Sequence, residues 1–122
     1  MSLRDTILSA DDLKESVEDI PEWGVKVLLR GMTGRQRVLY VESAGDRREF
    51  MYSDILIATA LNPKPNDQGK HERVFDPADR EALADKSGGV LERLALKAMK
   101  LSGVSLEDAE KDVDEDPTSV GS

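Results

Sequence analysis

Catalytic and metal sites in small proteins are built mostly from histidine, cysteine, activated serine and paired carboxylates. The 122-residue chain has no cysteine and a single histidine, His71, which lies in the polar stretch 62–73. A thiol nucleophile and a sulfur-bound metal are therefore excluded, and a lone histidine lacks the companion ligands of a zinc site. A serine nucleophile needs a positioned base, which a histidine in a polar loop does not provide.

The acidic side chains are numerous, but most of them lie near the two ends of the chain. A general acid or base needs burial or a close partner to shift its pKa, and exposed ends offer neither. The fingerprints of serine hydrolases, zinc proteases, phosphate-binding loops and dinucleotide-binding folds are all absent from the sequence. The sequence therefore predicts a protein that is not an enzyme and that binds no metal or cofactor.

Charge is distributed unevenly along the chain, whose net charge is −8 at pH 7. Residues 1–23 hold two basic and seven acidic side chains, and residues 105–122 hold one and seven, so the ends carry −5 and −6 and the middle +3. This balance disfavours nucleic-acid binding, which depends on neutralising phosphates. A small DNA-binding regulator is the alternative that a local basic patch would support; its residues are Arg35, Arg37, Arg47 and Arg48.

No segment of the chain is apolar over the length of a membrane span, and the N-terminal residues are charged. We therefore expect a soluble, cytoplasmic protein without membrane contact. With 122 residues and only five Phe, Tyr or Trp side chains, it forms one small domain with a modest core.

Without a reactive centre, the candidate functional residues are those expected on the surface. On the last helix described below, Leu94 and Ala98 centre the apolar side, whereas Leu96 and Met99 fall away from it at about 100° per residue. An exposed leucine beside a flexible methionine is either ordinary surface or a docking surface for a partner. Trp23, the only tryptophan, either caps the core at the start of a strand or anchors an interface. The candidate partner-binding residues are therefore Leu96, Met99 and Trp23.

Two consecutive helices are predicted over residues 75–103. Asp76 and Pro77 start the first, with a side-chain acceptor for free N–H groups and a proline where no N–H is missed. A break at Ser87-Gly88-Gly89 separates the two helices, with Ser87 as the cap of the second, and Gly103 stands where a left-handed stop is common. The apolar residues of the second helix recur at helical spacing: Val90, Leu91, Leu94, Ala95, Ala98 and Leu101.

Upstream of this pair, residues 25–30 alternate in the manner of a strand. Thr33 and Gln36 have the spacing of a capping box, which predicts a helix over 34–43. The β-branched and aromatic run 38–41 is also compatible with a strand, so helix and strand remain open over 36–42.

A further helix is predicted over 47–61, with Asp54 on its apolar side, where we expect it at a helix edge rather than in a catalytic pocket. Residues 62–73 contain two prolines and a glycine, which indicates a surface loop. Residues 74–75 are expected to form a short strand that returns to the edge of the sheet.

These elements predict an α+β fold: a mostly helical small domain with a short antiparallel β element near residues 24–31 and 73–75, covered on one face by helices. Residues 1–20 are expected to be a flexible acidic arm, residues 21–106 a single α+β domain, and residues 107–122 a disordered acidic tail.

Two stretches of the sequence resemble a known family. IPEWGVKVLLRGMTGRQR at 20–37 and RVFDPADREALADKSGGVLERLALKAMKLSGVSLED at 73–108 are similar to the tail assembly chaperones of long-tailed bacteriophages. The most telling parts are PEWG before the strand, the VFDP entry and the DKSGGVLERL joint between helices. The loop at 62–73 departs from the pattern, because such proteins often have a tight acidic turn there.

The resemblance implies a function. Proteins of this family bind the long, helical tape measure protein in the host cytoplasm, help to recruit the major tail tube protein, and are absent from the mature virion. This chain would be the short form, and a longer form often arises by ribosomal frameshifting. Self-association is a further expectation. The alternative is a structural adaptor or connector subunit that stays in the virion.

Overall fold

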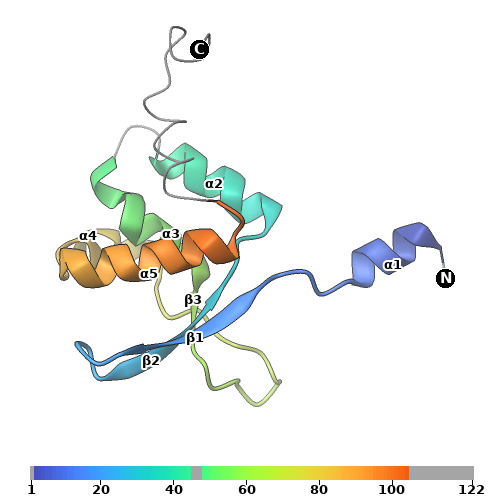
Figure 1. Ribbon diagram of the computed structural model, residues 1–122, viewed down its shortest axis with the longest axis horizontal. Coiled ribbons are helices and arrows are strands. Elements are labelled where there is room, and N and C mark those ends of the chain that lie inside the picture. The colour runs from blue at the N-terminus through green and yellow to red at the C-terminus, as the bar shows by residue number, and fades with distance from the viewer. Residues whose placement is uncertain (1, 45–47, 105–122) are drawn as a thin grey trace, which may run out of the picture.

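The computed structural model describes residues 2–44 and 48–104 of the chain. Its helices and strands form an α+β fold, which confirms the predicted class (Figure 1). In chain order the elements are α1 (Leu3–Ser9), β1 (Glu15–Ile20), β2 (Val25–Arg30), α2 (Gly34–Ala44), the 3-10 turn η1 (Arg48–Phe50), α3 (Met51–Thr59), β3 (Ala60–Leu61), the 3-10 turn η2 (Pro77–Asp79), α4 (Arg80–Ala84) and α5 (Gly88–Leu101).

The strands form one antiparallel sheet in the order β1-β2-β3. A tight turn joins β1 to β2, and Gly24 closes it with a φ of +68°, a conformation that side chains with a Cβ rarely adopt. Ile20 lies opposite Val25, and Leu28 lies opposite Leu61. The sheet is therefore a hairpin with a two-residue third strand.

One expectation about the sheet is wrong and another is half right. Residues 15–20 were expected in the flexible arm, but they form the edge strand β1. The acidic residues that suggested an arm pair with cations of the fold, Glu15 with Arg30 and Glu18 with Lys97. Residues 73–75 reach the edge of the sheet as expected, where Arg73 makes an antiparallel bridge with Leu61 and Val74 N–H donates to Ala60 O at 3.2 Å, but they do not form a strand.

The segment 36–42 is a helix rather than a strand. In the capping box before α2, Gln36 N–H donates to Thr33 Oγ1 (3.1 Å), and Thr33 N–H donates to Gln36 Oε1 (2.9 Å). The helix predicted over 47–61 is shorter than expected, because residues 60–61 are extended and pair with β2. The first residue of the predicted range, Arg47, lies outside the described residues.

The caps of the C-terminal helix pair are confirmed. Asp76 and Asp79 form a reciprocal capping box around η2. Ser87 accepts a hydrogen bond from Val90 N–H at the start of α5, and Gly103 follows its end with a φ of +77°. The predicted acidic tail at 107–122 lies outside the described residues.

The hydrophobic core lies between the sheet and helices α3 and α5. The sheet contributes Val27 and Leu29 to this core. Helix α3 contributes Ile55 and Leu56, and α5 contributes Leu94 among others. Helix α2 packs on α3, farther from the sheet, and α1 projects from the end of β1 away from the other helices (Figure 1).

Candidate docking surfaces

The predicted docking patch on α5 is not formed, because Met99 is buried. Met99 is 1% exposed and belongs to the core, whereas Leu96 is 38% exposed. The prediction assumed one narrow apolar face, but α5 contacts both α3 and the sheet, so its buried arc is wider. Leu96 therefore stands alone on the exposed side of α5, among Arg93, Lys97 and Lys100.

Trp23 lies in the turn between β1 and β2 and is half-buried against the core. Beside it, Glu22 is held by two hydrogen bonds from Arg93 of α5, at 2.8 and 2.9 Å. Trp23 therefore packs as a cap on the core, and its role as an interface anchor stays a prediction.

Helix α2 presents an apolar outer surface that the sequence did not single out. Val38 and Val41 are 58% and 61% exposed and lie three residues apart, so they are neighbours on one side of the helix. The β-branched run that suggested a strand is thus largely exposed. We call Val38 and Val41 the outer face of α2.

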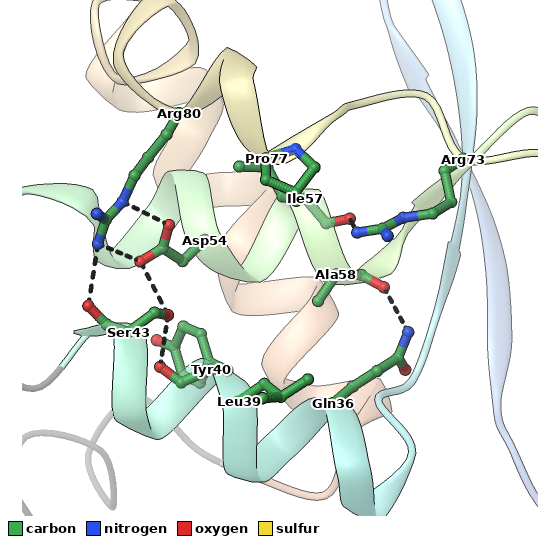
Figure 2. Close-up of a pocket in the computed structure, with 10 residues that line it drawn as sticks. All are labelled: Gln36, Leu39, Tyr40, Ser43, Asp54, Ile57, Ala58, Arg73, Pro77 and Arg80. Carbon is green, nitrogen blue, oxygen red and sulfur yellow. Dashed lines mark hydrogen bonds and ion pairs between the residues drawn. The ribbon is translucent and has the colours of Figure 1, made fainter.

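The opposite side of α2 borders an open groove. The groove lies between α2, α3 and the start of α4 and has a volume of about 510 Å³ (Figure 2). Its lining is mostly apolar; the lining residues are Gln36, Leu39, Tyr40, Ser43, Asp54, Ile57, Ala58, Arg73, Pro77 and Arg80. We call it the α2/α3 groove.

An ion pair closes one end of the groove. Arg80 donates from Nε to Asp54 Oδ1 and from Nη2 to Asp54 Oδ2, both at 2.9 Å (Figure 2). Arg80 Nη2 also donates to the carbonyl of Ser43 at 3.0 Å, and its guanidinium lies 4.3 Å from the centre of the Phe50 ring. Asp54 was expected at a helix edge, but its side chain is buried and lines the groove, where it bonds to Arg80 and Ser43.

Polar side chains at the other end of the groove bind backbone carbonyls. Gln36 Nε2 donates to Ala58 O at 3.2 Å, and Arg73 Nη2 donates to Ile57 O at 3.0 Å (Figure 2). These bonds occupy carbonyls at the end of α3, where helical partners run out. The groove is therefore a preformed apolar trough with polar ends that are already bonded.

The groove is poorly suited to acid–base chemistry. Burial raises the pKa of Tyr40 to about 12, and the charges of Asp54 and Tyr52 add to the effect, so the phenol is neutral near pH 7. His71 lies in the loop, where its Nδ1 is 2.8 Å from the Asn62 carbonyl oxygen. Among the residues that the structure describes, no group of three acidic or histidine side chains is placed to hold a metal.

Helix α1 carries a third apolar surface. Leu3, Ile7 and Leu8 are 75%, 61% and 67% exposed, and no residue of α1 is buried. Ser2 caps the helix by accepting a hydrogen bond from Asp5 N–H at 3.1 Å. The acidic residues that follow these apolar side chains in the sequence led to the prediction of a flexible arm, but residues 3–9 form a helix.

The basic patch is only partly described. Arg35 and Arg37 are exposed on the first turns of α2, Arg48 lies in η1, and Arg47 falls outside the described residues. No helix within residues 2–44 and 48–104 has both the length and the apolar character that a membrane crossing requires.

The fold is similar to that of a phage protein. No model of a known protein family and no curated protein matches the chain. Among solved structures, the tail assembly chaperone of bacteriophage HK97 is similar with a TM-score of 0.57 and 23% sequence identity. The likeness covers 80% of this chain and 91% of that one. The chain therefore has the fold of a phage tail assembly chaperone.

Proposed function

We propose that the protein is a tail assembly chaperone of a long-tailed bacteriophage, a non-enzymatic protein that binds the tape measure protein and helps to recruit tail tube subunits. The supporting observation is the shared fold with the HK97 tail assembly chaperone over 80% of the chain. The resemblance of the stretches at 20–37 and 73–108 to this family points in the same direction. In this role it acts in the host cytoplasm and is absent from the finished particle.

The outer face of α2 is the proposed contact surface for the client. Val38 and Val41 form an exposed apolar stripe on a helix that is fixed to the body through α3, and a helical client can pack along such a stripe. Leu96 on α5 is a second, smaller candidate. Met99 is not part of the proposal, because it is buried.

The charge of the chain suits a chaperone that keeps an aggregation-prone client apart from other copies. A net charge of −8 on 122 residues gives a self-repelling exterior, which favours solubility of a complex. The apolar contact surface and the acidic ends lie in different parts of the sequence. A bound client therefore does not neutralise the negative charge of the ends, which can still repel other complexes.

Co-expression with the long coiled-coil-like protein encoded just downstream tests the proposal. We expect the client to become soluble and to co-purify with the wild-type chain. The double variant Val38→Asp/Val41→Asp should lose the client while keeping its melting temperature, because both side chains are exposed. The matched control is Val17→Asp on β1, which is also exposed and should retain the client.

A client that remains insoluble with the wild-type chain contradicts the chaperone function. The alternative role, an adaptor retained in the virion, is separated by analysing purified particles. A chaperone is missing from them, whereas an adaptor is present at a fixed number of copies.

A further inference from the structure

The outer face of α2 is bordered by positive charge. Arg35 lies three residues before Val38, and Arg37 lies four residues before Val41, so each arginine is the neighbour of one valine on the helix surface. All four side chains are exposed. Helix α2 packs on α3 through its opposite side, which leaves this mixed apolar and basic surface open to a partner.

The two arginines are available for an acidic partner. Neither Arg35 nor Arg37 forms a side-chain hydrogen bond or ion pair with any residue that the structure describes. In contrast, Arg80 of α4 is paired with Asp54. The first turn of α2 also contains no acidic residue, although negative charge is the charge that a helix N-terminus favours. An acidic segment placed here would satisfy both the arginines and the helix dipole.

The chain beyond residue 104 starts beside this surface. Met32 N–H donates to Ser102 Oγ at 2.9 Å, and Val104 N–H donates to Met99 O at 2.8 Å. Helix α2 begins two residues after Met32, at Gly34, so the end of α5 lies beside the start of α2 (Figure 1). The residues that follow α5 are therefore attached close to the two arginines.

The length of this following segment is sufficient to cover the outer face. Residues 105–116 span up to about 40 Å when extended. Helix α2 has 11 residues and is only about 16 Å long. Glu42 follows Val41 and would repel an acidic segment, so the favourable part of the face ends there. The segment thus reaches all of that part.

The composition of residues 105–116 complements the face. The segment holds seven acidic side chains and one basic one, and its apolar residues Leu106, Ala109 and Val113 recur at intervals of three and four. Acidic side chains match the arginines, and apolar side chains match the two valines. Because the segment is tethered, its effective concentration is in the millimolar range, so a weak interaction is enough to occupy the face.

We propose that the acidic segment 105–116 docks on the outer face of α2 in the free protein, with its carboxylates toward Arg35 and Arg37 and its apolar side chains toward Val38 and Val41. The same face is the proposed client surface, so a client must displace the segment and thereby returns its charge to the solvent. The docking does not rest on the proposed chaperone function, whereas the displacement by a client does.

Paramagnetic broadening in NMR spectra of the full chain tests the docking. Because the chain has no cysteine, Ser119→Cys provides a single position for a spin label. We expect the amide signals of residues 35–41 to broaden at low salt. The broadening should fall at least about twofold in about 0.5 M salt, since exposed charges are then screened within a few ångströms.

Two charge-reversed variants separate docking from mere attachment. Asp112→Lys/Asp114→Lys keeps the length of the labelled segment but reverses two of its charges, so the broadening of residues 35–41 should be lost. Asp11→Lys/Asp12→Lys is the matched control, because it changes the net charge equally at the other end of the chain. This control should broaden like the wild type.

A charge exchange across the contact is the decisive measurement. Arg35→Glu/Arg37→Glu should lose the broadening while keeping the melting temperature of the wild type, because both side chains are exposed. Combining this variant with Asp112→Lys/Asp114→Lys restores opposite charges on the two sides and should restore the broadening. Each double variant alone thus fails, and the combination recovers.

Competition for a limiting client tests the displacement. Wild-type chain and Asp112→Lys/Asp114→Lys chain, carrying different tags, are co-expressed with the downstream coiled-coil-like protein. We expect about threefold more of the variant in the complex, as follows when the docked segment occupies the face about two-thirds of the time. The control Asp11→Lys/Asp12→Lys should share the client equally with the wild type.

Several results overturn the proposal. The docking is wrong if residues 35–41 show no broadening, if the Asp112→Lys/Asp114→Lys variant broadens equally, or if the broadening centres on another basic surface, such as Lys64 and Lys70 of the loop. Equal shares of the client in the competition overturn the displacement. A client bound by neither copy overturns the chaperone function and the displacement with it, while the NMR measurement still decides the docking.

Discussion

Arg80 donates two parallel hydrogen bonds of 2.9 Å to the Asp54 carboxylate, although 26 residues separate the two in the sequence. Only 8% of the Asp54 side chain is exposed, and 29% of that of Arg80. The pair ties the start of α4 to α3, and the further bond from Arg80 to the Ser43 carbonyl adds the end of α2. This guanidinium therefore joins all three helices that border one end of the α2/α3 groove.

Removing one partner of this pair should destabilise the fold. We expect Asp54→Ala to lower the free energy of unfolding by about 2 kcal/mol, between the values for exposed and for fully buried pairs. Arg80→Lys should recover little of the stability, because an ammonium cannot form the two-point contact. Urea titration measures both, and Arg4→Ala is the control, since its pair with Asp5 is exposed. A change as small as that of the control would contradict the assigned role.

The Glu22–Arg93 pair predicts a pH dependence. The hydrogen bonds from Arg93, followed by the backbone bond of Glu22 itself, lower the pKa of Glu22 from 4.5 to about 2. In the unfolded chain the Glu22 carboxyl becomes protonated near pH 4.5, whereas in the folded chain it does so only near pH 2. The stabilising contribution is therefore present above pH 4.5 and is lost as the pH falls toward 2. An NMR titration of the Glu22 carboxyl should give a midpoint near 2 in the wild type and nearer 4.5 in Arg93→Ala; equal midpoints would exclude the pair in solution.

Leu96 and Met99 should behave in opposite ways when shortened. Met99→Ala should cost about 2–5 kcal/mol of stability, because it leaves a cavity between α5 and its neighbours. Leu96→Ala should change stability by less than about 0.5 kcal/mol, as is usual for an exposed position. Thermal or chemical denaturation compares the two directly. Equal effects would mean that α5 is rotated relative to the arrangement described above.

Local signals in the sequence were enough to predict the helix caps. Thr33 with Gln36, Asp76 ahead of Pro77, and Ser87 all act within three or four residues, so these caps can be predicted from spacing along the sequence. The helix predicted over 34–43 rested on such a cap, although the run 38–41 left a strand open. The predicted α+β class was confirmed.

The features that were missed depend on contacts between distant segments. Strand β1 has mostly polar side chains, so its sequence does not indicate a strand. Its pairing with β2 and the ion pairs of Glu15 with Arg30 and Glu18 with Lys97 hold it in the sheet. The burial of Met99 follows from α5 meeting two neighbours at once. The α2/α3 groove combines three segments between residues 36 and 80, and no periodicity within one segment reveals it.

Gly31 and Gly34 provide a matched test of the junction between the sheet and α5. A Cβ on Gly31 would collide with the Leu101 carbonyl oxygen at the end of α5, whereas one on Gly34 would meet nothing within 4 Å. This junction is further fixed by Met32 N–H, which donates to Ser102 Oγ at 2.9 Å. The close approach of two backbones thus requires glycine at 31 but not at 34.

We expect Gly31→Ala to destabilise the protein by about 2 kcal/mol, because backbone atoms on both sides must move apart. Gly34→Ala should stabilise it by about 0.4–1 kcal/mol, since alanine restricts the unfolded chain and favours the helix that begins there. Urea titrations of the two variants give the comparison, and the difference in sign is the diagnostic result. If Gly31→Ala were as stable as the wild type, the end of α5 would not lie against the end of β2, and the wide buried arc that includes Met99 would lose its support.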